Sequence, residues 1–356
     1  MKQKTRAVCC GNIKMGAGAP ISIQSMTNTY TGDVEKTVAQ VKALEKAGCD
    51  IVRLAVNDAP AAAAVRAVKD AVTVPLVADI HFDHRLAIAS MENGIDKIRF
   101  NPGNIGSEAK VKELVSCAKA HHVPIRIGVN AGSLDKNLLA RYGGPAPEAL
   151  AESALSHVRI LEHAGFYDIV ISAKISSVQE TVETYRILHN ACDYPLHVGV
   201  TEAGGGEMAR IKSAIGIGAL LLDGIGDTLR VSLTGDPVQE VEAGRMILRV
   251  LGLRREGVEV ISCPTCGRCK NIAAHGALAE RVAKEFKQTG PYLKAAVMGC
   301  AVNGPGEARE ADIGIAFGRT NAVVFKRGEQ AFSGDLPEIT ERFLEEMRMM
   351  LQEKEK

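Results

Sequence analysis

The sequence has no excess of charge of either sign. Its 356 residues include 43 lysines and arginines and 42 aspartates and glutamates, for a formal net charge of +1 at pH 7. Nucleic-acid-binding proteins need a basic surface, and proteins that bind membrane surfaces need dense runs of one charge. The balance therefore argues against both classes, and we expect neither nucleic acid nor a membrane as a partner.

Long hydrophobic runs are also absent. The longest apolar stretches are too short to cross a bilayer, and the N-terminal Met-Lys-Gln-Lys-Thr-Arg is not followed by the apolar core of a signal peptide. The nine cysteines do not form the even framework of a small disulfide-rich domain, and they suit a reducing compartment. We therefore expect a soluble, cytoplasmic protein in which some thiols serve as ligands.

A dinucleotide-binding fingerprint is missing as well. The run Gly204-Gly-Gly206 lacks the G-x-G-x-x-G spacing that binds a pyrophosphate. Direct binding of NAD(P)H is therefore not indicated, and a redox reaction would draw its electrons from another carrier.

Four thiols and a carboxylate gather in the C-terminal part of the chain. They lie in Cys263-Pro-Thr-Cys266-Gly-Arg-Cys269 and in Gly299-Cys300-Ala-Val-Asn-Gly304-Pro-Gly306-Glu307, two segments that we expect to form loops shaped by Gly and Pro. C-x2-C lets two thiolates of one tight loop reach the same inorganic core, and a distant cysteine can close the site. A carboxylate is a harder ligand than a thiolate, so a Glu307 ligand would leave one iron accessible to a substrate oxygen.

The spacing alone leaves alternatives to an iron-sulfur site. A structural zinc site of four cysteines has acceptable spacing and is the main competitor. Half of a bacterial ferredoxin motif would require a further Cys-Pro, which Cys269-Lys-Asn271 does not supply. Buried free thiols are disfavoured because three cysteines lie so close together. The motif therefore favours iron-sulfur over zinc without excluding zinc.

Up to residue 251 the chain alternates short β-branched runs with segments of helical spacing. The expected strands are residues 20–26, 50–56, 75–82, 97–102, 124–129, 168–174, 195–200 and 227–233. The expected helices are residues 34–47, 60–72, 107–121, 147–164, 178–191, 207–222 and 238–251. Eight strands alternating with helices over about 250 residues predict a parallel (β/α)8 barrel of the TIM type.

The pattern changes after a charged connection at residues 252–257. Beyond it we expect strands at 258–262, 293–298, 312–317 and 322–326, with helices near 271–287 and from residue 337 onward. This predicts a separate, smaller α+β domain. The expected organisation is therefore a substrate-binding barrel over residues 1–253 and a metal-binding domain over residues 254–356.

Polar residues at the carboxyl ends of the barrel strands should converge on one mouth. They are Gln24, Ser25, Thr27, Arg53, Asp79, His81, Lys97, Arg99, Asn101, Asn104, Arg126, Asn130, Lys174, His197, Thr201, Glu202, Arg230 and Ser232. Four cations on four different strands, Arg53, Arg99, Arg126 and Lys174, would form a compact site for a ligand with several phosphate charges. For any one of them the alternative is an internal ion pair with Asp79 or Glu202.

Several long segments, in order along nearly the whole chain, resemble the family of bacterial 4-hydroxy-3-methylbut-2-enyl diphosphate synthases. They are Gln24-Ser-Met-Thr-Asn-Thr29, Val77-Ala-Asp-Ile-His-Phe82, Arg99-Phe-Asn-Pro-Gly-Asn-Ile-Gly106, Ile125-Arg-Ile-Gly-Val-Asn-Ala-Gly-Ser-Leu134, Thr201-Glu-Ala-Gly204, Gly224-Ile-Gly-Asp-Thr-Leu-Arg-Val-Ser-Leu233 and the two cysteine-bearing segments. The resemblance implies a barrel joined to a small cluster domain.

The resemblance also implies an activity in the non-mevalonate isoprenoid pathway. The substrate 2-C-methyl-D-erythritol 2,4-cyclodiphosphate would be opened and dehydrated with two electrons to 4-hydroxy-3-methylbut-2-enyl diphosphate. The electron donor would be flavodoxin or ferredoxin. The alternative from another class is a barrel that binds a phosphorylated ligand and carries a structural zinc site.

The resemblance assigns ligands and suggests roles for the mouth residues. A [4Fe-4S] cluster would be held by Cys263, Cys266, Cys300 and Glu307. Cys269 departs from the common family pattern, and we favour a bystander role over competition with Glu307. The four mouth cations would hold the cyclic diphosphate, with neutral hydrogen bonds from Asn101, Asn130 and Ser232. Glu202 is the candidate proton donor to the departing hydroxyl.

The connection at residues 252–257 is short for a chain that must fold back over its own barrel. The resembling family solves this problem as a dimer, in which the cluster domain of one chain covers the barrel of the other. We therefore expect a homodimer.

Overall fold

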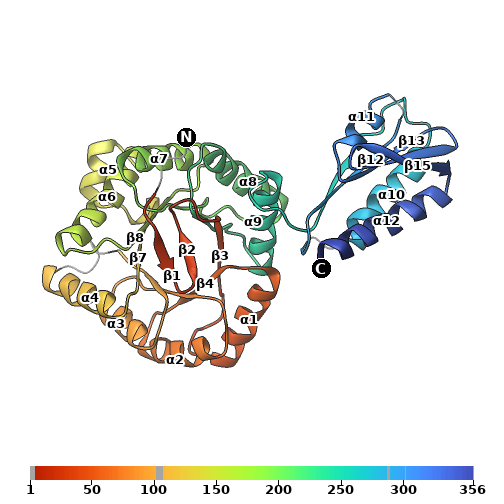
Figure 1. The fold of residues 1–356 in the computed structure, drawn as a ribbon. Helices are drawn as coiled ribbons and strands as arrows, with labels where there is room; N and C mark the ends of the chain where they lie inside the picture. The colour runs from red at the N-terminus through yellow and green to blue at the C-terminus, as the bar shows by residue number, and fades with distance from the viewer. Residues whose placement is uncertain (1–4, 102–106, 287–288, 301, 356) are drawn as a thin grey trace. The chain divides into compact units, whose positions relative to one another are not determined.

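The computed structural model describes residues 5–101, 107–286, 289–300 and 302–355. The chain divides into two compact units, Met1–Leu253 and Arg254–Lys356. Each unit has its own hydrophobic core, and each is described below by itself (Figure 1).

The first unit is a barrel of eight parallel strands. In order around the sheet they are β8 (Ile169–Lys174), β7 (Ile125–Asn130), β6 (Lys97–Arg99), β5 (Leu76–Asp79), β4 (Ile51–Ala55), β3 (Ser22–Met26), β10 (Thr228–Leu229) and β9 (His197–Val198). A parallel bridge between Ile171 and Leu196 closes the ring. The predicted TIM-type barrel is confirmed, although β9 and β10 are much shorter than the expected strands at 195–200 and 227–233.

Helices surround the strands as an outer ring (Figure 1). They are α1 (Val34–Ala47), α2 (Ala59–Asp70), α3 (His84–Glu92), α4 (Glu108–Ala120), α5 (Lys136–Tyr142), α6 (Pro147–His163), α7 (Val178–Ala191), α8 (Gly206–Leu222) and α9 (Val238–Val250). Helix α1 shows why the boundaries fall where they do. The Asp33 side chain accepts from the Lys36 N–H at its start, and Gly48 adopts φ +91° at its end. Helix α5 was not expected from the sequence, and of α3 only the end at Glu92-Asn93-Gly94 was expected.

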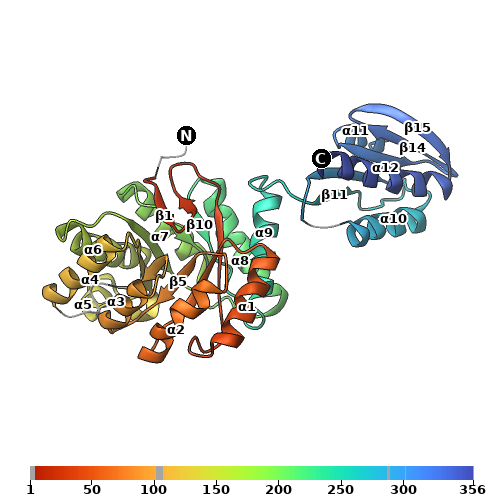
Figure 2. The ribbon, with the colours of Figure 1, turned by 60° about the horizontal axis from the view of Figure 1, so that its bottom comes forward.

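A short antiparallel hairpin closes the amino-terminal end of the barrel (Figure 2). It consists of β1 (Val8–Cys10) and β2 (Ile13–Met15), neither of which the sequence analysis identified. Buried side chains of the hairpin pack against Ile51, Val77 and Val170, which lie near the starts of three barrel strands. The hairpin thus fills one end, so any ligand site must lie at the opposite, carboxyl end.

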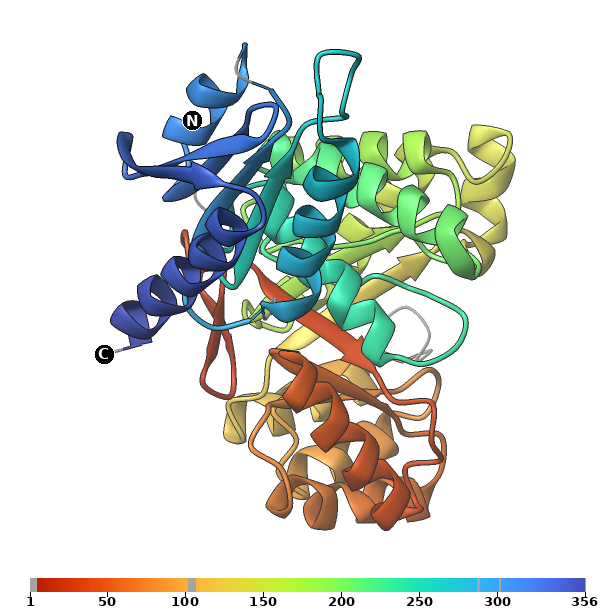
Figure 3. The same ribbon diagram turned by 90° about the vertical axis from the view of Figure 1, so that its right-hand side faces the viewer.

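The second unit is a five-stranded sheet with helices on both faces. The strands follow chain order: β11 (Val258–Ser262), β12 (Leu293–Met298), β13 (Ile313–Phe317), β14 (Asn321–Lys326) and β15 (Glu329–Asp335). The first two pairings are parallel and the last two antiparallel. Helices α10 (Ile272–Glu285) and α12 (Glu338–Glu355) share one core with the sheet, and α11 (Gly304–Arg309) packs on the other face (Figure 3).

Two sequence expectations are corrected in this unit. Strand β15 was not expected, and residues 304–307 were expected to be a loop shaped by Gly and Pro, whereas they form the first turn of α11. Proline is tolerated in a first helical turn because its missing N–H would be unpaired there anyway. Among the helices of the described residues, none combines the length and apolarity needed to cross a membrane.

Candidate functional site

A cavity of about 150 Å³ lies at the carboxyl ends of the barrel strands. Its lining is almost entirely polar and contains five basic side chains. The lining residues are Arg53, Asp79, His81, Arg99, Arg126, Asn130, Ser172, Lys174, Thr201, Arg230 and Ser232. Among the described residues Asp79 is the one carboxylate in this lining, so the cavity is strongly positive and suits a multiply charged anion.

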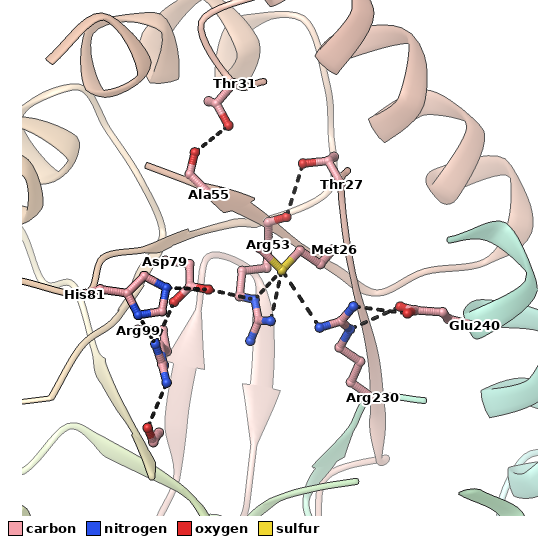
Figure 4. Close-up of polar contacts among 11 residues, drawn as sticks. Met26, Thr27, Thr31, Arg53, Ala55, Asp79, His81, Arg99, Arg230 and Glu240 are labelled. Carbon is pink, nitrogen blue, oxygen red and sulfur yellow. Dashed lines mark hydrogen bonds and ion pairs between the residues drawn. The ribbon is translucent and has the colours of Figure 1, made fainter. Parts of the chain in front are cut away.

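Asp79 links two of the arginines. Its Oδ1 accepts a hydrogen bond from Arg99 Nη1 at 3.2 Å, and its Oδ2 lies 3.5 Å from Arg53 Nε (Figure 4). Burial opposes ionisation of Asp79, but Arg53 and Arg99 outweigh it and hold the pKa of this carboxyl below its ordinary value. Burial lowers the pKa of Arg53 to about 10. Arg53 and Arg99 therefore both form the internal ion pair with Asp79 that the sequence analysis considered as an alternative to ligand binding, and they share its single negative charge.

Arg230 is held by a second carboxylate, that of Glu240 on α9. Its Nη2 and Nε donate to the two carboxylate oxygens at 3.0 and 3.1 Å (Figure 4). Ser25 Oγ also donates to Glu240, at 2.8 Å. The sequence analysis placed Arg230 at the mouth but not among the anion-binding cations. Its position directly after the last barrel strand in the sequence could have identified Arg230 as a further cation of this site.

Arg126 and Lys174 contrast with these paired arginines. The Arg126 side chain is only 1% exposed, and within the part of the chain that the structure describes its Nε and Nη1 have no hydrogen-bond partner. Burial lowers the pKa of Arg126 and of Lys174 well below their ordinary values, and neighbouring arginines add to the effect. A buried guanidinium with unused donors is costly unless an anion supplies the acceptors.

Six of the seven predicted substrate-binding residues line this one cavity. Those that line it are Arg53, Arg99, Arg126, Asn130, Lys174 and Ser232. Asn101 does not line it. Its amide instead donates to Gly128 O at 2.8 Å and accepts from Gly128 N at 2.9 Å. Gly128 must lack a side chain, because a Cβ there would come 2.5 Å from Arg99 Nε. Asn101 thus holds the backbone of Gly128 beside Arg99, and its role as a ligand-binding residue stays a prediction.

Glu202 lies at the mouth but outside the cavity lining. It is exposed and adopts φ +53°, a strained conformation for a residue with a side chain. Its neighbour Thr201 does line the cavity. Lys97 is buried deeper in the barrel, with its Nζ 3.4 Å from Met15 Sδ of the hairpin. Asn104, another expected mouth residue, falls outside the described residues.

The two cysteine-bearing segments follow neighbouring parallel strands of the second unit. Cys263 comes directly after β11, and Cys300 follows β12, whose residue Val297 pairs with Ser262. Since parallel strands end at the same edge of a sheet, the two segments meet there. The contact is direct, because the Gly299 N–H donates to Cys263 Sγ at 3.1 Å.

The chemistry of these thiols fits metal ligation. The backbone N–H of Arg268 lowers the pKa of Cys266, and those of Asn303 and Val302 lower the pKa of Cys300. Thiolates are the form of cysteine that ligates metals, so a lowered pKa favours the ligating form of both residues. Glu307 is exposed in the first turn of α11. Among the described side chains, no three acidic, histidine or cysteine groups already converge on a single metal ion.

Fold and site together define a (β/α)8-barrel protein with an anion site at its mouth and an appended cysteine-bearing domain. Two family models match it: the GcpE TIM-barrel domain at residues 5–245 and the GcpE protein C-terminal domain at residues 259–349. The chain therefore belongs to the GcpE family, whose members are 4-hydroxy-3-methylbut-2-en-1-yl diphosphate synthases. This confirms the resemblance drawn from the sequence motifs.

Two relatives illustrate the similarity. The chain is 58% identical to a protein of Caldanaerobacter subterraneus subsp. tengcongensis over 353 residues, which cover 99% of each chain. It is 54% identical over 354 residues to a protein of Fusobacterium nucleatum subsp. nucleatum, covering 99% of this chain and 98% of the relative. Both are named 4-hydroxy-3-methylbut-2-en-1-yl diphosphate synthase (flavodoxin). These enzyme relatives do not support the alternative of a binding protein with structural zinc.

Among solved structures, the barrel is similar to 3-dehydroquinate dehydratase from Geobacillus kaustophilus. The TM-score is 0.51 at 15% identity, and the match covers 71% of this chain and 98% of the dehydratase. At this identity the similarity shows the fold alone.

Proposed function

We propose that this chain catalyses the reductive ring opening and dehydration of 2-C-methyl-D-erythritol 2,4-cyclodiphosphate to 4-hydroxy-3-methylbut-2-enyl diphosphate. The observation that carries the proposal is the buried guanidinium of Arg126, whose Nε and Nη1 lack an acceptor within the described residues of a cavity lined by five cations. The names of the close relatives support the same reaction.

The cyclic diphosphate would supply the negative charge that this cavity lacks. Arg126 and Lys174 would gain acceptors, and Arg53 and Arg99, which share Asp79, would each gain a further one. Asn130 and Ser232 would add neutral hydrogen bonds from the cavity lining. Cations fixed before the substrate arrives also stabilise the charge that develops on the departing ring phosphate oxygen.

Glu202 is the proposed proton donor to the departing hydroxyl. It follows β9 at the mouth and is exposed, next to the cavity-lining Thr201. Its φ of +53° is maintained at a conformational cost, and such strain is concentrated at functional sites. A carboxylic acid that donates a proton in the transition state contributes about 10²-fold to 10⁴-fold in rate.

Cys263, Cys266, Cys300 and Glu307 are the proposed ligands of a [4Fe-4S] cluster. When bound, the cluster would supply electrons singly, with flavodoxin or ferredoxin as their source. The chain prepares for it by favouring the thiolates of Cys266 and Cys300 and by directing the Gly299 N–H at the Cys263 sulfur. Such hydrogen bonds to ligand sulfurs help to set a cluster's potential.

A homodimer is the proposed assembly, formed in the cytoplasm. Helices α8 and α9 expose a set of large apolar side chains beside an apolar groove of about 250 Å³ between them. The exposed residues are Met208, Ile211, Ile215, Leu222, Met246 and Val250. Monomeric proteins rarely leave such a face in water. A second copy is the proposed occupant, because one apolar face can pair with itself about a two-fold axis.

Metal analysis tests the cofactor part of the proposal. Protein purified without oxygen should be brown, with broad visible absorption and with iron and sulfide in equal amounts. A colourless protein that retains zinc would contradict the assignment of Cys263, Cys266, Cys300 and Glu307.

A further inference from the structure

Cys269 lies beside Cys263, although the sequence analysis treated it as a bystander. Its side chain is only 6% exposed, and its N–H donates to Cys266 O at 2.9 Å, which closes a tight turn. The Cys269 sulfur is 2.8 Å from the position that a Cβ would take on Gly299, and the Cys263 sulfur is 3.1 Å from the same position. The two sulfurs are therefore neighbours, and a side chain at residue 299 would collide with both.

The remaining two thiols, Cys266 and Cys300, interact electrostatically. Cys266 is exposed, and it lies close enough to Cys300 for that thiol to disfavour its ionisation. Arg268 interacts electrostatically with both sulfurs. The geometry thus places Cys263 with Cys269, which are not a C-x2-C pair.

We propose that Cys263 and Cys269 form an intrachain disulfide when the cluster is absent and a hydroperoxide is present. The peroxide oxidises the Cys263 thiol to a sulfenic acid and leaves as water or an alcohol. The Cys269 thiol then attacks that sulfur, the sulfenic oxygen departs as water, and the S–S bond forms. The two thiols together lose two electrons and the peroxide gains them. A dithiol reverses the reaction by exchange.

Accessibility assigns the two roles. Cys263 is half-buried and can be reached from solvent, whereas Cys269 is buried behind it. Of these two thiols the peroxide should therefore reach Cys263, and Cys269 should act as the resolving thiol; the exposed Cys266 can be oxidised as well, so the Cys266→Ser variant isolates the reaction of the pair. The disulfide protects Cys263 from irreversible oxidation. If Cys263 is a cluster ligand, as the proposed function holds, the same bond also prevents cluster assembly until it is reduced.

Peptide mapping tests the proposal on the full chain. The protein is freed of iron under reducing conditions, treated with one equivalent of hydrogen peroxide, alkylated and digested with trypsin. Cleavage after Arg268 and Lys270 leaves Cys269 in a dipeptide, whereas Cys263 and Cys266 share the peptide 256–268. The expected product is peptide 256–268 joined to Cys269-Lys270 through Cys263, with a loss of two free thiols per chain. A dominant disulfide inside peptide 256–268 would overturn the proposal.

Two variants complete the test. Cys266→Ser should keep the joined peptides, and Cys269→Ser should abolish them while leaving the circular dichroism spectrum unchanged. Iron and sulfide uptake supplies a separate readout. Oxidised wild type should regain its cluster only after a dithiol is added, whereas oxidised Cys269→Ser, in which the Cys263 sulfenic acid has no resolving thiol, should regain less of its cluster even with a dithiol. Joined peptides with unimpaired uptake would support the disulfide but contradict Cys263 as a ligand. Absence of the joined peptides would overturn the disulfide and leave the proposed function unaffected.

Discussion

Arg99 and Arg126 are register partners on the neighbouring strands β6 and β7, but their hydrogen bonding differs. Arg99 donates to Asp79, to His81 and to Gly128 O, the last at 2.8 Å. Arg126 is buried, and across the described residues its Nε and Nη1 have no acceptor. One arginine thus supports the fold of the mouth, whereas the other remains available for a ligand.

Replacing Arg126 should stabilise the free protein while weakening substrate binding. Arg126→Met removes a buried cation with unused donors, so we expect the free energy of unfolding to rise by about 1–3 kcal/mol. Affinity for the cyclic diphosphate should fall by at least about 2 kcal/mol. Urea unfolding and isothermal titration calorimetry measure the two quantities.

Arg99→Met is the matched control, and it should lower the free energy of unfolding. The variant leaves Asp79 and Gly128 O without one of their donors in a buried site. If both variants were destabilised equally, Arg126 would be a structural arginine and our interpretation of the cavity would be wrong.

Lys97 should make stability depend on pH in the alkaline range. Burial lowers its pKa from 10.5 to about 8 in the folded protein. Between these values the unfolded chain binds more protons, so wild-type stability should rise as the pH increases. Below pH 8 the folded protein bears the full free-energy cost of burying the charged Lys97 side chain. The free energy of unfolding of Lys97→Met should therefore exceed that of wild type most at pH 7, and the difference should shrink toward pH 10.5. Urea unfolding of both proteins across this range checks it, and a constant difference would contradict it.

Glu202→Gln should impair turnover without affecting the cofactor. If Glu202 donates a proton, kcat should fall about 10²-fold or more, with substrate affinity and iron content unchanged. The control is Glu207→Gln, which alters an exposed acid in the first turn of α8. Near-normal turnover of Glu202→Gln with an intact cluster would remove Glu202 from the mechanism.

Ile215→Glu should dissociate the proposed dimer. The charge would have to be buried at the apolar face of α8 and α9, whereas in a monomer it would stay in water. Sedimentation velocity should show wild type as a dimer and this variant as a monomer with unchanged circular dichroism. Met349→Glu, which alters an exposed residue of α12 away from the cysteine-bearing segments, should remain dimeric. Wild type that sediments as a monomer would refute this assembly.

The barrel and the members of its cationic site were predictable for physical reasons. Parallel strands need helical crossovers, so strand and helix periods must alternate along the chain. The carboxyl ends of the strands meet at one mouth, so Arg53, Arg99, Arg126 and Lys174 could be grouped from sequence position alone. The sequence does not show which of these four cations lacks a hydrogen-bond partner in the protein, because that depends on distances between side chains in the folded structure.

Other features leave little trace in the sequence. Strands β1 and β2 have three residues each, too few for an alternating pattern, and β15 exposes most of its side chains. The pairing of Arg230 with Glu240 depends on how α9 packs against the barrel. Gly304 is buried in a helix rather than placed in a turn. Glycine suits this position because a Cβ there would lie only 3.1 Å from the Cβ atoms of Met298 and Ala316.

The most direct test of the central claim is an anaerobic reaction followed by ³¹P NMR. The reaction contains the cluster-loaded chain, reduced flavodoxin and 2-C-methyl-D-erythritol 2,4-cyclodiphosphate. We expect the cyclic diphosphate resonances to be replaced by those of a linear diphosphate, with two electrons consumed per product. Unchanged cyclic resonances, despite an intact cluster and bound substrate, would contradict the account.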